Sequence, residues 1–360
     1  MNEKTKIYFF NPYPGIGGAD TTIQRFIQSI NLNKYEIEYF TLKKKVSFQK
    51  KIKCTQINSN STFLSFFKIL KIVKKDKNKK KIFFSMQYFV NVWTIIFMKF
   101  ILKIKTFVYE INHLNELRDQ KNFSEFFKKN LIFLLVKFLY NFSDIVATNS
   151  KESGNELSKY IGKKVITIYN PCFEKISIRK KKYKKKSDLK ILNIARLVEQ
   201  KDQMTILKAI NLSKIKNKVK FTIVGFGHLK SKLLEYIKKN KLNCKIISNE
   251  TNLKKYYLKN DLFIFSSLYE GLPTTMVEAA SYCMPIISSD FKTGSKEILS
   301  LNKGGYIFEI KNYKKLSDLI YKFYQNPSSF YKKEMFCRDN IYKFSKNKNL
   351  KLFNSILDKI

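Results

Sequence analysis

The stretch ILNIARLVEQKDQMTILKAI, residues 191–210, carries the pattern that decides the fold. An apolar run over 189–195 is typical of a strand that is buried on both faces. A charged turn follows, and residues 203–212 then have a helical pattern. A strand that leads through a short polar turn into a helix is the repeating unit of a parallel α/β sheet.

The same alternation continues on both sides of this stretch. Strands are predicted over 6–10, 82–85, 106–109, 144–148, 165–169, 220–224, 245–247, 262–266 and 286–289. The charge run RKKKYKKKSD over 179–188 interrupts it and indicates a linker. We therefore predict an α/β protein with two Rossmann-like domains. The domains are residues 1–175 and 189–345, with a Lys-rich linker over 176–188 and a terminal helix over 346–360 that can pack back on the first domain.

A glycine turn, Pro14 to Asp20, follows the first predicted strand and precedes a helix. Gly17 and Gly18 allow the backbone to approach a phosphate, and the start of the helix supplies partial positive charge. A glycine pair at this place is also compatible with a plain turn, so the motif alone leaves both interpretations open.

A second strand-to-helix turn has the sequence SSLYEGLPTTMVE over 266–278. Glu270 lies in the turn and Glu278 lies about one turn into the helix, on either side of Gly271, Leu272, Pro273 and Thr274. Two carboxylates beside backbone that favours anions indicate a ligand site. In the alternative interpretation, Glu270 is a solvated loop acid and Glu278 interacts with the helix dipole.

The turn after the strand at 189–195 holds Arg196 and Lys201. Arg196 is one of only five arginines in a chain that otherwise uses lysine. A guanidinium can bind two phosphate oxygens at once, and Lys201 adds a point charge. Together these side chains could neutralise a diphosphate leaving group, a task that other enzymes give to a metal ion.

These motifs resemble those of the retaining glycosyltransferases of family 4, which have the GT-B fold of two Rossmann-like domains facing across a cleft. The resemblance rests on residues 194–210, 222–229 and 266–290, and on the Gly17-Gly18-Ala19-Asp20 turn. It implies that Arg196 and Lys201 hold the donor diphosphate and that Glu278 binds the ribose. It also implies that Glu270 holds the transferred sugar, together with the backbone of Gly271, Leu272, Pro273 and Thr274.

The resemblance further places His113, which follows the strand at 106–109, near the sugar as a catalytic residue beside Glu270. A purely structural histidine is the alternative. Asp20 stands where the family has Glu, and Phe226 and residues 247–250 depart from the family pattern where the base is expected. The resemblance implies no cofactor and no metal, and no Asp-x-Asp sequence occurs in the chain.

The 360-residue chain has 70 Lys and Arg against 28 Asp and Glu, a net charge of +42. One interpretation of this excess is an AT-rich genome, which encodes lysine wherever a surface charge is tolerated. The other interpretation is attraction to a polyanion. Anionic phospholipid is the preferred polyanion, because no nucleic-acid recognition motif occurs. Five scattered cysteines without a CxxC pair indicate a reducing compartment. We predict a cytoplasmic protein, peripheral on the inner face of the membrane and without a transmembrane helix.

Two segments of the first domain, 64–75 and 126–142, mix apolar residues with lysine in the manner of interfacial helices. A core helix is the alternative for each segment. In the first segment, Leu64, Phe67 and Leu70, with Ile69 and Val73, are predicted to share one face. The predicted function is retaining transfer of a sugar, from a UDP-linked donor, to a lipid-linked glycan acceptor in bacterial surface glycan synthesis. The alternatives are an inactive regulatory protein that binds sugar nucleotides and, less favoured, a nucleic-acid-binding protein.

Overall fold

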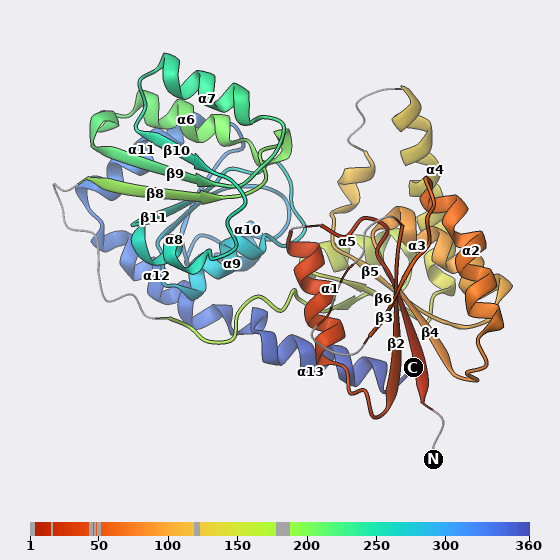
Figure 1. Ribbon diagram of the computed structural model, residues 1–360. Coiled ribbons are helices and arrows are strands. Elements are labelled where there is room, and N and C mark those ends of the chain that lie inside the picture. Colours follow the sequence, from red (N-terminus) through yellow and green to blue (C-terminus); the bar gives the residue numbers. More distant parts are fainter. Residues whose placement is uncertain are drawn as a thin grey trace. The chain divides into compact units, whose positions relative to one another are not determined.

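The computed structural model describes residues 4–15, 17–42, 46, 48, 52–118, 123–177 and 188–360 (Figure 1). The chain forms two compact units. Unit 1 consists of Met1–Pro171 and Asn347–Ile360, and unit 2 consists of Cys172–Lys346. Each unit is built on its own parallel sheet.

The described part of unit 1 contains a seven-stranded parallel sheet in the order β3-β2-β1-β4-β5-β6-β7. Its strands are β1 Thr5–Phe10, β2 Tyr35–Thr41, β3 Lys53–Gln56, β4 Lys81–Met86, β5 Lys105–Glu110, β6 Ile145–Thr148 and β7 Ile166–Thr167. Its helices are α1 Gly18–Ser29, α2 Thr62–Lys75, α3 Tyr88–Thr94, η1 Ile95–Ile101, η2 Leu114–Leu117, α4 Phe123–Leu139, η3 Tyr140–Phe142, α5 Lys151–Ile161 and α13 Lys346–Leu357. The central strands are apolar on both sides because helices cover both faces of the sheet.

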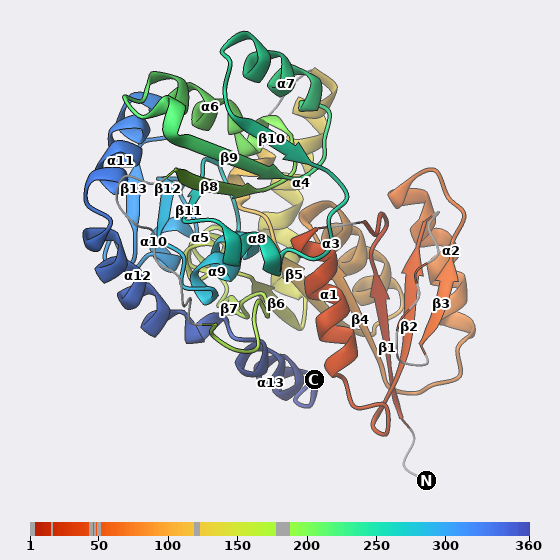
Figure 2. The ribbon, with the colours of Figure 1, turned by 60° about the vertical axis from the view of Figure 1, so that its left-hand side comes forward.

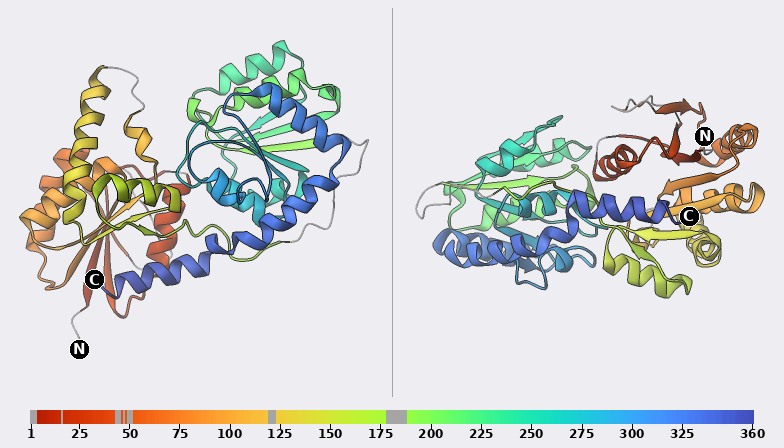
Figure 3. Two further views of the ribbon diagram at one scale, coloured as in Figure 1. Left: turned by 180° about the vertical axis from the view of Figure 1, so that it is seen from behind. Right: turned by 90° about the horizontal axis from the view of Figure 1, so that it is seen from below.

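The two faces of this sheet have different covers. α1 and α13 lie side by side on one face (Figures 2 and 3), where the Phe26 and Phe353 rings stack with centroids 4.3 Å apart. α2, α3, η1, α4 and α5 pack on the other face. Because Phe353 also contacts Phe84 and Phe107 of the sheet, the C-terminal helix completes the core of unit 1.

Unit 2 contains, among the described residues, a six-stranded parallel sheet in the order β10-β9-β8-β11-β12-β13. Its strands are β8 Leu189–Ile194, β9 Val219–Val224, β10 Cys244–Ile247, β11 Leu262–Phe265, β12 Ile286–Ser289 and β13 Tyr306–Phe308. Its helices are η4 Glu199–Lys201, α6 Gln203–Leu212, η5 Lys216–Lys218, α7 Lys230–Lys239, α8 Lys254–Lys259, α9 Thr274–Ser281, α10 Ser295–Ile298, α11 Tyr313–Gln325, α12 Ser328–Asn340 and η6 Ile341–Phe344. α6, α7 and α11 pack on one face, and α8 and α9 lie on the other (Figure 1).

The structure corrects the predicted end of the first domain. The Cys172 N–H donates to the Phe344 carbonyl at 3.1 Å, and the Ser177 N–H donates to the Ser281 carbonyl at 2.8 Å. Residues 172–175 therefore belong to unit 2 rather than to the first domain. Residues 178–187 of the predicted linker lie outside the described residues.

Three strands were not predicted, and one predicted strand is shorter than expected. β2 contains Glu36 and Glu38, which interrupt its apolar pattern. Glu38 is nonetheless buried, because Lys6 and Lys53 lie 3.2 Å and 3.1 Å from its carboxylate. β3 is an edge strand with a polar sequence, and β13 is only three residues long. The strand predicted over 165–169 is reduced to Ile166–Thr167.

The predicted apolar face of α2 is also wrong in part. Ile69 and Val73 are fully buried in the core with Phe66, whereas Leu64 and Phe67 are exposed on the outer side. Two separate faces of the helix therefore carry apolar residues that the sequence analysis placed together. A search of the described helices finds none that is both long and apolar enough to cross a bilayer.

Candidate active site

The predicted donor-binding residues of unit 2 lie in the loops that follow β8 and β11, at the carboxyl ends of the strands. Ligands of open α/β sheets bind at this edge. The loop after β8 carries Arg196 and Lys201, and the loop after β11 carries Glu270 and leads into α9. The parallel order of the sheet places β8 beside β11, so the two loops are neighbours.

The backbone at Arg196 is fixed by the loop that follows β9. The Leu197 N–H donates to the Phe226 carbonyl at 2.8 Å, and a side chain at Gly225 would place its Cβ 1.9 Å from the Ala195 carbonyl oxygen. Only glycine allows this close approach. The Arg196 side chain is exposed and makes no hydrogen bond or ion pair with the residues that the structure describes. Arg196 is thus held at its backbone while its guanidinium is available to a ligand.

Lys201 and Glu270 form an ion pair, with side chains only 13% and 10% exposed. Their loops are joined on both sides of the pair. The Gln200 side chain donates to the Tyr269 carbonyl at 2.8 Å, and the Leu268 N–H donates to the Gln200 carbonyl at 2.8 Å. The structure therefore brings together the cation predicted for the diphosphate and the carboxylate predicted for the sugar.

The turn from Gly271 to Thr274 leads directly into α9, and a third loop supports it. Thr293 donates a hydrogen bond from its hydroxyl to the Glu270 carbonyl. Gly294 has a φ of 92°, and a Cβ there would lie 2.9 Å from the Pro273 ring. The sequence analysis did not single out these two residues. Their position after β12, the next strand of the parallel sheet, was the signal that could have identified them.

Glu278 is the fifth residue of α9, as predicted. The buried Tyr257 hydroxyl donates to Glu278 Oε2 at 2.9 Å and lies 3.2 Å from the Thr275 carbonyl. Burial, and then the Glu278 charge, raise the pKa of Tyr257 well above its usual value. Tyr257 therefore remains a donor and orients the carboxylate of Glu278. No sequence motif marked Tyr257.

In unit 1, Gly17 precedes α1 and Gly18 is its first residue. Asp20 accepts a hydrogen bond from the Asn11 amide at 2.8 Å, which ties the first turn of α1 to the end of β1. Among the residues that the structure describes, a Cβ at Gly17 would have no heavy atom within 4 Å. These neighbours therefore do not account for glycine at this position.

His113 follows β5 and is buried, with its Nε2 in contact with the Glu156 carboxylate of α5. Its carbonyl accepts a hydrogen bond from the Glu116 N–H at 2.9 Å, at the start of η2. The ring is therefore held in one orientation. This arrangement accommodates either the predicted catalytic role or the structural alternative.

Glu110, the last residue of β5, is a buried carboxyl group that the sequence analysis did not single out. Its Oε1 accepts hydrogen bonds from the Asn91 amide at 2.6 Å and from the Tyr140 hydroxyl. Burial raises the pKa of Glu110 well above its usual value of 4.5, although both hydrogen bonds oppose the shift. Burial therefore favours the protonated form of Glu110.

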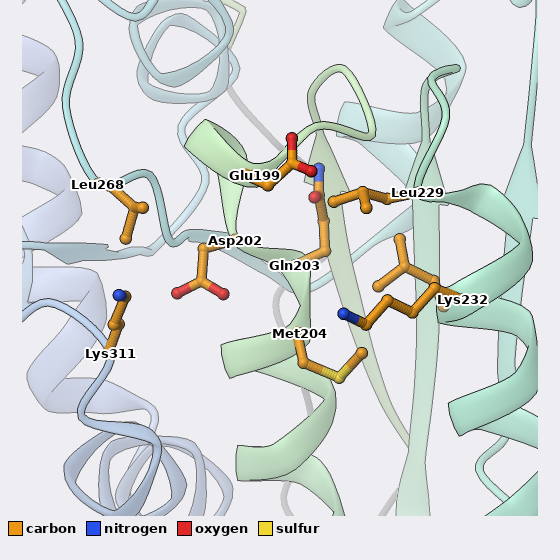
Figure 4. Close-up of a pocket in the computed structure, with 9 residues that line it drawn as sticks. Glu199, Asp202, Gln203, Met204, Leu229, Lys232, Leu268 and Lys311 are labelled. Carbon is orange, nitrogen blue, oxygen red and sulfur yellow. The ribbon is translucent and has the colours of Figure 1, made fainter. Parts of the chain in front are cut away.

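A cavity of about 240 Å³ lies beside η4 and the start of α6, the elements that follow Arg196 in the chain (Figure 4). Its lining includes Asp202, Gln203 and Lys311, and in Figure 4 the Asp202 carboxylate and the Lys311 amine point toward each other. The Gln203 amide donates to the Arg196 carbonyl at 2.9 Å. The cavity thus borders the predicted site without containing its side chains. Across the described ranges, no three His, Cys, Asp or Glu residues are placed to hold a metal ion.

Unit 2 is similar in sequence to a family of known proteins. The family described as glycosyl transferases group 1 matches residues 174–344, which cover nearly all of unit 2. An uncharacterized glycosyltransferase of Methanocaldococcus jannaschii is 30% identical over 251 residues, which are 65% of this chain and 61% of that protein.

A second relative covers more of the chain. The N-acetylgalactosamine-N,N'-diacetylbacillosaminyl-diphospho-undecaprenol 4-alpha-N-acetylgalactosaminyltransferase of Campylobacter jejuni is 24% identical over 318 residues, 83% of this chain and 84% of that protein. Among solved structures, the UDP complex of Anabaena HepE has a TM-score of 0.78 at 13% identity and covers 99% of this chain and 100% of its own. The apo form of the lipopolysaccharide outer core galactosyltransferase WaaB has a TM-score of 0.75 at 18% identity, with 99% and 100% covered. Unit 2 therefore matches the family of glycosyl transferases group 1, and the chain as a whole has the GT-B fold of these glycosyltransferase structures.

Proposed function

We propose that this protein is a retaining, metal-independent glycosyltransferase of family 4 that transfers a sugar from a UDP-linked donor to a lipid-linked glycan. The observation that carries the proposal is the Lys201–Glu270 ion pair beside the unpaired Arg196. This arrangement offers two cations to a diphosphate and one carboxylate to sugar hydroxyls within joined loops. The backbone from Gly271 to Thr274 supports the sugar, and Glu278, held by Tyr257, binds the ribose.

In the proposed reaction, the acceptor hydroxyl attacks the anomeric carbon from the face that the diphosphate leaves. The bond from that carbon to the acceptor oxygen forms as its bond to the phosphate oxygen breaks. The departing phosphate oxygen takes the hydroxyl proton, so the anomeric configuration is retained. Arg196, Lys201 and the start of α9 stabilise the developing charge of the diphosphate. For Gly17, Gly18 and His113 we keep the donor-binding and catalytic roles that the family resemblance implies.

The UDP donor is supported by the UDP complex of HepE, and the lipid-linked acceptor by the undecaprenol in the name of the Campylobacter relative. The pathway proposed is bacterial surface polysaccharide, lipooligosaccharide or glycoprotein glycan synthesis. The net charge of +42 favours a cytoplasmic location at the anionic inner face of the membrane. Apart from the donor and acceptor, no cofactor or nucleic acid is needed.

Calorimetric titration with UDP-, GDP- and ADP-sugars tests the donor, and transfer to an undecaprenyl-diphosphate-linked sugar tests the acceptor. We expect selective binding of UDP-sugars and a product with the anomeric configuration of the donor, established by NMR. An inverted product contradicts the retaining mechanism. Binding of a UDP-sugar without turnover on any acceptor favours the inactive regulatory protein instead.

A further inference from the structure

Helix α4 of unit 1 carries apolar side chains on two opposite faces. Ile132 and Val136 are buried in the core beside Tyr140. On the opposite side, Phe127, Leu131, Leu134 and Phe138 are each between 51% and 59% exposed. At about 100° per residue these four lie within about 60° of one another and form one stripe. The outer face of a surface helix is normally polar, so this stripe requires an explanation.

The stripe continues beyond the helix. Phe142, at the end of η3, is exposed, and its ring lies 5.0 Å from the ring of Phe100 in η1. Ile101, next to Phe100, is also exposed. We call these seven residues the apolar ridge: Phe127, Leu131, Leu134, Phe138, Phe142, Phe100 and Ile101. Figures 1 and 3 show α4 extending past the edge of the unit 1 sheet.

Lysines flank the apolar ridge, and the nearby acids are already paired. Lys128 and Lys137 lie on the two sides of the stripe and are exposed, and neither forms an ion pair within the described ranges. In contrast, Glu125 pairs with Lys129 at 3.5 Å and Asp144 pairs with Lys99 at 2.7 Å. The charge that surrounds the ridge is therefore positive.

We propose that the apolar ridge inserts into the interfacial layer of an anionic lipid bilayer, so that α4 is the element that docks unit 1 to the membrane. The inference rests on the proposed lipid-linked acceptor, and it names the docking element. Aromatic and aliphatic side chains flanked by lysine match the chemistry of such a surface. A second copy of the chain fits less well, because each copy carries a net charge of +42.

Helix α2 provides an internal comparison for this inference. Its outer side carries Lys71, Lys74 and Lys75, but only Leu64 and Phe67 as exposed large apolar residues. Attraction through α2 is therefore electrostatic, whereas α4 can also bury apolar area in the lipid. The two helices make different predictions for vesicles that lack charge.

The test is co-sedimentation of the whole protein with vesicles of phosphatidylglycerol and phosphatidylethanolamine, and with phosphatidylcholine alone. The triple variant Phe127→Gln/Leu131→Gln/Phe138→Gln is expected to bind anionic vesicles at least tenfold more weakly than wild type. The matched control on α2, Leu64→Gln/Phe67→Gln, is expected to bind within twofold of wild type. A conservative variant, Phe127→Leu/Phe138→Leu, should also bind as wild type does. Circular dichroism and UDP binding confirm that every variant is folded.

Unchanged vesicle binding by the triple variant overturns the inference, as does an equal loss in the α2 control. Wild-type protein that ignores both kinds of vesicle but transfers sugar to a soluble acceptor analogue overturns the docking while the proposed function stands. Ridge-dependent vesicle binding without turnover of any UDP-sugar has the opposite meaning. In that case the docking inference holds and the proposed function fails.

Discussion

Glu110 and Glu270 are both glutamates near the carboxyl ends of parallel strands, but their surroundings are opposite. Glu270 lies in a loop after β11 and is largely buried, where it pairs with the cation of Lys201. Glu110 ends β5 and is fully buried, and its hydrogen-bond donors among the described residues, Asn91 and Tyr140, are neutral. A glutamate beside a cation can serve a ligand, whereas burial among neutral donors raises the pKa of Glu110 and suits a role in the core. Both residues follow or end a parallel strand, so the difference in function that we assign to Glu110 and Glu270 comes from their surroundings.

The largest effect is expected at the charged site of unit 2. Glu270→Ala and Arg196→Ala should each reduce sugar transfer to less than about one tenth of wild type, which corresponds to about 1.4 kcal/mol of barrier. Arg196→Ala should lose little stability, since Arg196 is exposed, whereas Glu270→Ala leaves the largely buried Lys201 unpaired and should also lower the free energy of unfolding. Steady-state kinetics with a UDP-sugar measures the loss. Glu235→Ala, an exposed glutamate of α7, is the matched control and should remain active.

A variant that retains more than one tenth of the activity, while Glu235→Ala behaves as wild type, contradicts the role given to that residue. If that variant is Glu270→Ala, Glu270 is an ordinary loop carboxylate, and its difference from Glu110 has no functional meaning.

A smaller effect is expected at Tyr257, the residue that orients Glu278. Tyr257→Phe removes one hydroxyl from a buried site and leaves the ring stacked on Tyr282, with centroids 5.0 Å apart. UDP binding should weaken about three- to fivefold, since one shared hydrogen bond is lost. Calorimetry with UDP and 2′-deoxy-UDP gives the readout. A positioning role affects UDP more than the deoxy analogue, whereas a purely structural role weakens both equally.

Tyr256→Phe is the control for this variant. Tyr256 is adjacent in α8, and its hydroxyl donates to Glu250 at 3.1 Å rather than to Glu278. We expect Tyr256→Phe to leave the ratio between the two nucleotides unchanged. The same shift of the ratio in both variants contradicts the assignment to Tyr257.

The sequence predicted β8 to β12 of unit 2 because these strands are apolar runs separated by glycine, proline and charged turns, and it missed the three-residue β13. It also predicted two Rossmann-like domains, a fold that the structural neighbours share. It missed β2, because the buried Glu38 is stabilised by Lys6 and Lys53 from neighbouring strands. Such pairing between strands leaves no periodic signal in one segment.

The candidate site was predictable only where residues are close in sequence. Arg196 and Lys201 share one turn, and Glu270 and Glu278 flank another. Tyr257 and Thr293 come from separate loops, so only the folded chain shows their hydrogen bonds to Glu278 and to the Glu270 carbonyl. The sequence likewise could not show that α2 buries Ile69 and Val73 while α4 leaves a second apolar face exposed.

A modest and pH-dependent effect is expected at Glu110. Its raised pKa means that the folded protein keeps a proton that the unfolded chain releases above about pH 4.5. The stability from this group is therefore present at low pH and is lost as the pH rises toward the folded-state pKa. Glu110→Gln keeps the shape and the acceptor for Asn91 and Tyr140 without a linked proton. Relative to this variant, the free energy of unfolding of wild type should decline as the pH rises from 5 to 8.

Denaturant unfolding followed by circular dichroism at several pH values measures this difference. If the curves of wild type and Glu110→Gln stay parallel, the pKa of Glu110 is not raised in the folded protein. The surroundings of Glu110 would then not explain why Glu110 and Glu270 have different roles.

The smallest effect is expected from removing divalent cations. In the proposed site, the positive charge for the diphosphate comes from Arg196, Lys201 and the first turn of α9. A bound cation would therefore add little to the stabilisation of the leaving diphosphate. Turnover of a UDP-sugar in excess EDTA should therefore equal turnover in Mg²⁺ or Mn²⁺. The Arg196→Ala variant sharpens the test. If its residual activity alone becomes dependent on Mg²⁺, a metal replaces the missing guanidinium, which supports the role of Arg196. Strict dependence of the wild type on a divalent cation contradicts the metal-independent mechanism, because Arg196 and Lys201 would then be insufficient to stabilise the leaving diphosphate.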